Sequence, residues 1–156
     1  MKIGITNDHH GFHLKEILTE FLDEAGYNVI DYGANTGNVE DYGIVSSEVV
    51  DFPIYAFKLG EALKNKEVDL GIAICGSGIG MSIALNKIKG VYCAKISTTS
   101  EAISSRAHND ANCIAFGQDL DEELAKEIVL KFIETPFSNI DRYIKRNNMI
   151  KNKENE

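Results

Sequence analysis

The sequence has fewer positive charges than negative ones. It holds 16 Lys and Arg residues against 24 Asp and Glu residues, which gives a formal net charge of −8. Because nucleic-acid backbones bind clustered Lys and Arg side chains, we expect no nucleic-acid partner. The sequence also lacks an apolar run long enough to span a membrane, and it begins with a predicted strand instead of a signal-peptide pattern. These absences predict a cytoplasmic protein with no membrane partner.

Cysteine is scarce as well. Cys75, Cys93 and Cys113 are odd in number, and no two of them have the CxxC spacing. This pattern argues against a disulfide scaffold or a structural zinc site and fits a reducing compartment. No repeat or linker divides the 156 residues. We therefore predict one domain over residues 1–150, followed by a frayed polar tail over residues 151–156.

Predicted strands and helices alternate along the chain. Apolar runs predict strands at 2–6, 29–30, 70–74, 91–96 and 113–116. Helical spacing and helix-start signals predict helices at 14–25, 53–65, 78–86, 99–107, 121–134 and 140–151. The alternation predicts an α/β protein with a single doubly wound, parallel five-stranded sheet of Rossmann-like type and a C-terminal helix. Ligands of such sheets bind beyond the carboxyl ends of the strands.

A glycine-rich turn over residues 75–80 follows the third predicted strand. Cys75 ends that strand, whereas Cys93 and Cys113 lie inside strands and are expected to be buried apolar residues. Free backbone N–H groups of the turn favour an anion there, and a thiolate at Cys75 could act as a base or as a nucleophile. The spacing fits neither GxGxxG nor a Walker A loop nor the G-x-S-x-G elbow. A turn that binds an enediolate or a carboxylate remains.

Asp8, His9 and His10 follow the first predicted strand. With His13 they could form a metal site. Adjacent residues in a turn rarely ligate one metal together, so an Asp that orients sugar hydroxyls beside a His near an anion is favoured. His10 and His13 are then expected to be surface or structural residues.

Two further groups of polar residues lie near the end of the chain. Arg142 and Arg146 share one helix face and could form a forked clamp for a phosphate or a carboxylate, or belong to an ordinary solvated face. The His108-Asn109-Asp110 segment could be functional, or Asn109 could cap a helix. On local grounds both alternatives stay open.

Taken together, these motifs resemble the sugar-phosphate isomerase family that contains type B ribose-5-phosphate isomerase and the galactose-6-phosphate isomerase subunits. The motifs that carry the resemblance run through nearly the whole chain in the family's order: residues 8–9, 51–53, 74–80, 84–87, 105–112, 115–117 and the Arg142/Arg146 pair. The resemblance implies an aldose–ketose isomerisation through a cis-enediolate without metal or cofactor. The substrate expected first is ribose 5-phosphate, of the pentose phosphate pathway.

The resemblance also assigns roles to residues. Cys75 would move the proton between C1 and C2, and His108 with Asp8 would open the sugar ring. Ser77 and the turn would stabilise the enediolate oxygens, and Asn109 would hold these oxygens or the sugar hydroxyls. The substrate-binding set would be His9, Phe52, Gly76, Gly78, Ile79, Gly80, Asn109, Arg142 and Arg146, with no metal ligand.

The predicted topology separates His108 from Cys75. His108 precedes the fifth strand, so it lies at the opposite edge of the sheet, roughly 15–20 Å away. A second subunit related by a two-fold axis could bring it to Cys75. The family builds its sites between subunits, so we expect a homodimer with shared sites; in some members dimers pair into tetramers.

Several positions depart from the family's pattern at the substrate end. Asp119 stands where an arginine usually binds phosphate, Tyr92 replaces another arginine, Tyr143 a histidine and Phe52 a common tyrosine. The acidic segment 34–50 is longer than in the shorter members and suggests a cover over the site or a subunit contact. Other aldose phosphates (hexose 6-phosphates or tetrose phosphates) and free aldoses therefore remain alternatives. So does a non-catalytic sugar-phosphate-binding subunit of a hetero-oligomer.

Overall fold

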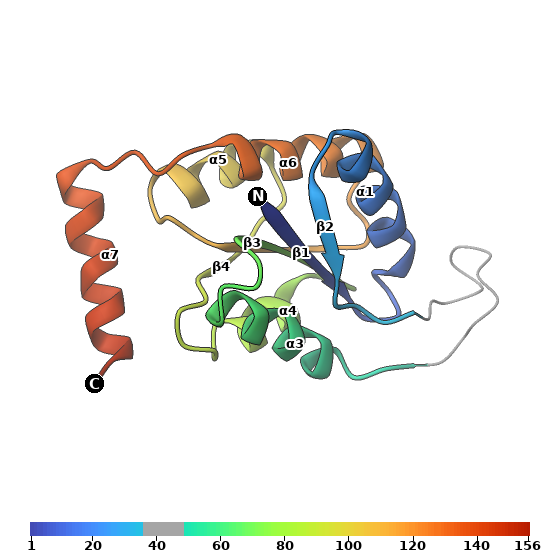
Figure 1. The fold of residues 1–156 in the computed structure, drawn as a ribbon, viewed down its shortest axis with the longest axis horizontal. Helices are drawn as coiled ribbons and strands as arrows, with labels where there is room; N and C mark the ends of the chain where they lie inside the picture. The colour runs from blue at the N-terminus through green and yellow to red at the C-terminus, as the bar shows by residue number, and fades with distance from the viewer. Residues whose placement is uncertain (36–48) are drawn as a thin grey trace.

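A parallel five-stranded sheet forms the centre of the molecule (Figure 1). The computed structural model describes residues 1–35 and 49–156. The strands are β1 (Lys2–Asn7), β2 (Asn28–Asp31), β3 (Leu70–Cys75), β4 (Cys93–Lys95) and β5 (Cys113–Gly117). The helices are α1 (Phe12–Glu24), α3 (Phe52–Lys64), α4 (Ile79–Leu85), α5 (Thr99–Ala107), α6 (Glu122–Glu134) and α7 (Asp141–Glu154). The predicted fold class is confirmed.

Helices cover both faces of the sheet, as Figure 1 shows. Successive side chains of a strand point to opposite faces. In β3, Ile72 and Ile74 join the core formed with α1, α5 and α6, whereas Ala73 and Cys75 join the core formed with α3 and α4. This alternation fixes the direction of the Cys75 side chain, which points to the α3/α4 face.

The strand order is β2-β1-β3-β5-β4. From β1 the chain first builds outward to β2 and then returns to place β3 on the other side of β1. The order therefore reverses between β1 and β3, and ligands of open α/β sheets bind in the crevice at such a point. Asn7 pairs with Ile74 at this crevice, so Asp8 and Cys75 follow on adjacent strands.

Two elements differ from the sequence-based expectation. The fourth strand contains only Cys93–Lys95, because the Tyr92 amide donates to the Asn112 side chain at 2.9 Å instead of to a neighbouring strand. The expectation of a frayed tail from residue 151 is wrong, since α7 continues to Glu154 and Glu154 accepts two hydrogen bonds from the body of the protein. Most of the longer acidic segment, residues 36–48, lies outside the described residues.

A search of the described residues finds no helix that combines the length and the apolar character needed to cross a membrane.

Candidate active site

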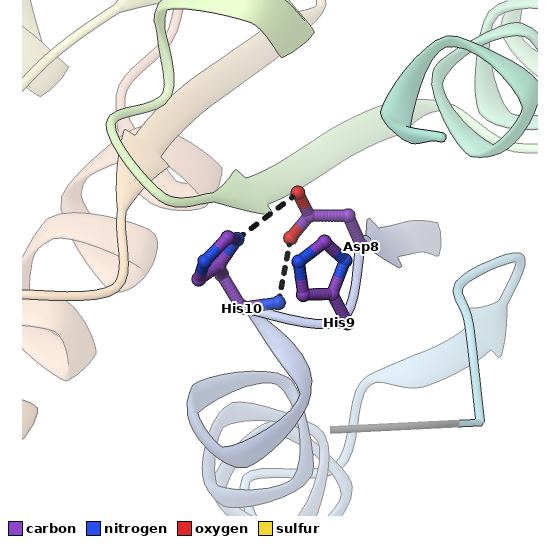
Figure 2. Close-up of side chains that lie close together, drawn as sticks. All are labelled: Asp8, His9 and His10. Atoms are coloured by element: carbon purple, nitrogen blue, oxygen red, sulfur yellow. Dashed lines mark hydrogen bonds and ion pairs between the residues drawn. The ribbon is translucent and has the colours of Figure 1, made fainter. Parts of the chain in front are cut away.

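Asp8 lies just beyond the end of β1 and is almost completely buried. Its Oδ1 accepts a hydrogen bond from the amide of His10 at 2.9 Å (Figure 2) and another from the amide of Gly11 at 3.2 Å. Its own amide donates to the carbonyl of Ile74 at 3.3 Å, which ties it to the neighbouring strand. Oδ2 remains within 3.6 Å of the Nδ1 atom of His10. The carboxylate is thus fixed by the backbone on one oxygen and directed toward His10 with the other.

His9 is fixed through its ring nitrogen. The amide of Val50 donates to Nδ1 of His9 at 3.2 Å. A neutral imidazole whose Nδ1 accepts a hydrogen bond carries its hydrogen on Nε2, so Nε2 is a donor. This arrangement suits a hydrogen bond to an anionic oxygen.

The donor atoms of Asp8, His9 and His10 lie within 4.8 Å of one another, close enough to hold a metal ion (Figure 2). A metal would need a lone pair from each imidazole. The Nδ1 lone pair of His9 already accepts the Val50 amide, and Oδ1 of Asp8 already accepts two amides. The hydrogen bonds therefore favour the hypothesis of an anion- and sugar-binding turn over the alternative metal site.

His10 lies beside the residues predicted for the site. Its ring lies 4.1 Å from the His9 ring, and a Cβ placed at Gly76 would be 3.8 Å from its Nδ1. The partly exposed His10 side chain therefore lies between the Asp8 carboxylate and the glycine-rich turn, a proximity that was not predicted from the sequence. The available signal was its position next to a predicted site residue at the carboxyl end of a strand.

Cys75 is the last residue of β3, as predicted, and its side chain is buried. The amide of Gly78 donates to its Sγ at 3.1 Å. A hydrogen bond from an amide can stabilise negative charge on the sulfur, which a base requires. The carbonyl of Cys75 accepts from the Gln118 amide at 2.9 Å and so connects the turn to the end of β5.

Two glycines of the turn have packing roles. Gly78 has φ of +81°, and a Cβ there would lie 2.6 Å from the Cα of Phe116. At Gly80 a Cβ would lie 2.6 Å from the Phe52 ring, which packs on the start of α4. Phe52 therefore packs against the turn.

Ser77 lies at the exposed side of the turn. Its Oγ accepts the Ile79 amide at 3.2 Å, which leaves its hydroxyl hydrogen available as a donor. Two of the amides predicted to bind an oxyanion, those of Gly78 and Ile79, are donors within the turn in this structure.

A cavity of about 280 Å³ opens beside Gly76 and Ser77. Asp119 lines it, so the acidic residue expected at the substrate end does border the turn. Lys95, the last residue of β4, lines the same cavity. This cation was not predicted from the sequence. The signal that could have revealed it is that Lys95 ends a strand, as Cys75 does.

His108, Asn109 and the two arginines belong to a second group. In the register of β3 and β5, Gly71 pairs with Cys113 at the amino end and Cys75 with Gly117 at the carboxyl end. His108 caps the C-terminal end of α5 and precedes Cys113, so it lies at the edge of the sheet opposite to Cys75. The predicted site residues thus form two groups, one at each edge of the sheet, as the topology predicted.

The second group is completed by helix α7, which carries Arg142 and Arg146. The ring of Tyr143, on this helix, stacks on the exposed ring of His108. This contact joins the helix with the two arginines to the His108 side of the sheet.

The two remaining cysteines lie within strands of the sheet, and Cys113 is buried whereas Cys93 is only partly buried. Cys93 and Cys113 pair in register on β4 and β5. Burial, followed by the contact with Cys93, raises the pKa of the Cys113 thiol well above its usual value. Cys113 is therefore an uncharged core residue, as predicted, and Cys75 is the cysteine at the carboxyl edge.

Fold and site together define an α/β protein with a thiol and a carboxylate at the switch point of a parallel sheet. The model of a protein family described as Ribose/Galactose Isomerase matches residues 3–150. The chain belongs to this family.

Relatives and solved structures agree with this membership. Ribose-5-phosphate isomerase B of Escherichia coli (strain K12) is 43% identical over 129 residues, which cover 82% of this chain and 80% of that protein. The structure of Clostridium thermocellum ribose-5-phosphate isomerase B is similar with a TM-score of 0.89 and 39% identity, over 99% of this chain and 98% of that one. The Mycoplasma genitalium ribose-5-phosphate isomerase B with bound ribulose-5-phosphate has a TM-score of 0.87 and 32% identity, over 99% and 97% of the two chains.

Proposed function

We propose that this chain interconverts an aldose phosphate and its ketose, with ribose 5-phosphate and ribulose 5-phosphate as the first candidate pair. The observation that carries the proposal is the Cys75 sulfur at the switch point, with the Gly78 amide 3.1 Å away. Membership in the family supports an isomerase of sugar phosphates, and the relatives named above support the pentose substrate.

In the proposed reaction the Cys75 thiolate removes the proton from C2 of the open-chain aldose. The C–H electron pair forms the C1–C2 double bond, and the carbonyl oxygen O1 becomes the enediolate oxygen. The proton of the C2 hydroxyl passes to O1, and Cys75 then returns its proton to C1 as the carbonyl forms at C2. Ser77 and the turn donate hydrogen bonds to the developing negative charge. General acid–base catalysis, the role assigned to Cys75, contributes about 10²–10⁴-fold to a rate.

Ring opening precedes the proton transfer. A base removes the proton from the C1 hydroxyl, an acid protonates the ring oxygen, and the C1–ring oxygen bond breaks. We assign this step to His108 and Asp8, with Asn109 on the sugar or enediolate oxygens. Since His108 and Asp8 lie at opposite edges of one sheet, the proposal requires a homodimer in which His108 of one subunit serves Cys75 of the other.

The phosphate would bind His9, Arg142 and Arg146. The described structure supports the His9 contact through its Nε2 donor, as derived above. Lys95 supplies a further positive charge in the cavity beside Ser77. Asp119 in the same cavity would repel a phosphate dianion. The preferred sugar phosphate therefore depends on whether its phosphate group lies nearer to Lys95 or to Asp119.

A substrate panel tests the proposal. Purified chain is offered ribose 5-phosphate, a hexose 6-phosphate, a tetrose 4-phosphate and free ribose, and ketose formation is measured. We expect turnover of at least one aldose phosphate and loss of about 10³-fold or more in Cys75→Ala. Cys93→Ala is the matched control and should keep wild-type turnover. If the wild-type chain forms no ketose from any of these sugars, the proposed activity is wrong and the alternative of a non-catalytic subunit is favoured. If Cys75→Ala keeps substantial turnover, Cys75 is not the base.

Metal independence is a separate part of the proposal. Exhaustive treatment with a chelator should leave the rate unchanged, because neither proton transfer nor ring opening is assigned to a metal. Loss of turnover that returns on addition of zinc would instead assign the Asp8, His9 and His10 cluster a metal ion.

A further inference from the structure

Helix α7 is attached to the body of the protein by polar residues on one face. It stands apart from the layers that cover the sheet (Figure 1). Of its 14 residues, all are exposed except Tyr143, Asn147 and Glu154. These residues follow one another at spacings of four and seven, which places them on one side of a helix. Each of the three contacts a residue outside α7.

Two of these contacts converge on His108. The Tyr143 ring stacks on the His108 ring with centroids 4.5 Å apart and an angle of 21° between the planes. Nδ2 of Asn147 donates to the His108 carbonyl at 3.1 Å. The first contact restrains the side chain, and the second restrains the backbone at the end of α5.

The same tyrosine also contacts Arg142. The guanidinium carbon lies 4.7 Å from the centre of the Tyr143 ring, and Nη2 donates to the Tyr143 hydroxyl at 3.3 Å. A cation over an aromatic ring is attracted by the negative charge of the ring face. Tyr143 is therefore in contact with both His108 and Arg142.

Glu154 fastens the other end of the helix. Its carboxylate accepts hydrogen bonds from the Gly90 amide at 3.0 Å and from the Tyr92 hydroxyl at 2.7 Å. These two residues precede β4 and belong to the body of the protein. The helix is thus held at both ends, with Asn147 between them.

We propose that Tyr143 is a positioning residue that orients the His108 imidazole and the Arg142 guanidinium as one unit, and that Glu154 secures the helix that carries it. The proposal rests on the function proposed above, in which His108 takes part in ring opening and Arg142 binds phosphate. Displacement of a catalytic group by about 1 Å can cost 10²-fold in rate. An exposed histidine without the stacked ring would sample several rotamers, of which only some are productive.

The test compares Tyr143→Leu, which removes the ring, with Tyr143→Phe, which keeps it. Met149→Ala, an exposed position of the same helix, is the matched control. The chemical shift of the His108 Cε1 proton, assigned by comparison with His108→Gln, reports the stacking independently of activity. Values of kcat and KM for ribose 5-phosphate report the consequence for the reaction, and the thermal midpoint reports folding.

We expect the His108 proton to shift in Tyr143→Leu and to keep its position in Tyr143→Phe and Met149→Ala. The kcat of Tyr143→Leu should fall about tenfold or more, whereas Tyr143→Phe and Met149→Ala should stay within about threefold of wild type. An unshifted His108 proton in Tyr143→Leu, an unchanged kcat, or an equal loss in Tyr143→Phe would overturn the proposal.

The two proposals fail in different ways. If wild-type protein isomerises no sugar phosphate, the proposed function is wrong, and the proton shift still shows whether Tyr143 orients His108. If wild type is active and Tyr143→Leu is equally active, the proposed function stands and the positioning role is wrong. A rise in KM at constant kcat in Tyr143→Leu would also contradict it, because that result assigns Tyr143 to substrate binding alone.

Discussion

The amide of Gly78 lies 3.1 Å from the Cys75 sulfur and donates a hydrogen bond to it. This contact depends on a left-handed backbone at Gly78, with φ of +81°, and on its close approach to the backbone of Phe116. The glycine therefore couples the stability of the fold to the chemistry of the thiol.

Substitution of this glycine should affect both properties. Gly78→Ala introduces a Cβ that would lie 2.6 Å from the Cα of Phe116 and also carries the cost of a left-handed alanine, about 1–2 kcal/mol. We expect a loss of stability larger than that cost and a fall in kcat, because the amide moves away from the sulfur. Denaturant unfolding and initial rates measure the two effects.

Gly26→Ala is the control for Gly78→Ala. Gly26 has φ of +90°, and a Cβ there would meet no atom within 4 Å. This variant should lose about 1–2 kcal/mol of stability through the backbone alone and keep its kcat. Equal effects at the two positions would contradict the role of the Phe116 contact.

The separation of the two groups of site residues predicts complementation between variants. Cys75→Ala and His108→Gln should each be inactive as homodimers. In a heterodimer of the two, one shared site keeps both residues, so about half of the wild-type activity should return. Heterodimers isolated with two different affinity tags provide the measurement. Heterodimers that form and remain inactive would show that the site is not shared.

Arg142 should fall into the same complementation group as His108. Both residues contact Tyr143 of their own chain, so the same subunit would supply both of them to a shared site. Heterodimers of Arg142→Ala with Cys75→Ala should recover activity, whereas those of Arg142→Ala with His108→Gln should not exceed the more active of the two homodimers. Recovery in the second pair would place Arg142 at the site that contains Cys75 of its own chain.

Lys95 and Asp119 should affect the affinity for phosphate in opposite directions. Two unit charges about 4 Å apart interact by about 1 kcal/mol in water, so each change should alter KM by about fivefold. Lys95→Met should raise the KM of aldose phosphates and Asp119→Asn should lower it, with both effects reduced at high salt. Lys87→Met serves as the control. An unchanged KM in both site variants would mean that the phosphate binds outside this cavity.

Tyr92 should cause the protein to lose stability at alkaline pH. Burial, followed by the hydrogen bond and the charge of Glu154, raises the pKa of Tyr92 from 10.0 to about 12. A group with a raised pKa in the folded chain contributes its full stabilisation below the unfolded pKa and loses it as the pH rises through the folded pKa. The contribution of Tyr92 is therefore present below about pH 10 and disappears between about pH 10 and 12.

Urea unfolding at about pH 9 and at about pH 11 tests this dependence. Wild type should lose more stability between these two values than Tyr92→Phe does. Tyr27→Phe, which also removes a phenol, should decline as wild type does. A decline in Tyr92→Phe as steep as that of wild type would contradict the link between Tyr92 and Glu154.

The sheet and one edge of the site were predictable from the sequence. The alternation of apolar runs and helical spacing specified a parallel sheet, and carboxyl ends of adjacent parallel strands meet at one edge. Asp8 and Cys75 were therefore expected to lie near each other, and the structure places Asp8 just beyond the end of β1 and Cys75 at the end of the adjacent β3. The opposite location of His108 followed from the same topology.

The contacts of individual side chains were not predictable. The sequence of α7 has no apolar stripe from which its packing partners could be predicted. The helix is held instead by one aromatic stack and by polar contacts. Lys95 is separated from Ser77 in the sequence, and only the order of β5 and β4 in the sheet brings it to the same cavity. The position of His10 likewise depends on the path of the backbone around Asp8.

Both hydrophobic cores are built within one chain, on the two faces of its own sheet. We therefore expect a separated subunit to stay folded, although it holds only one group of the proposed site residues at each edge. Dilution of the proposed homodimer below its dissociation constant would then abolish turnover while leaving each subunit folded. Specific activity would therefore rise with protein concentration, so the turnover of each subunit would depend on how much of the protein is present.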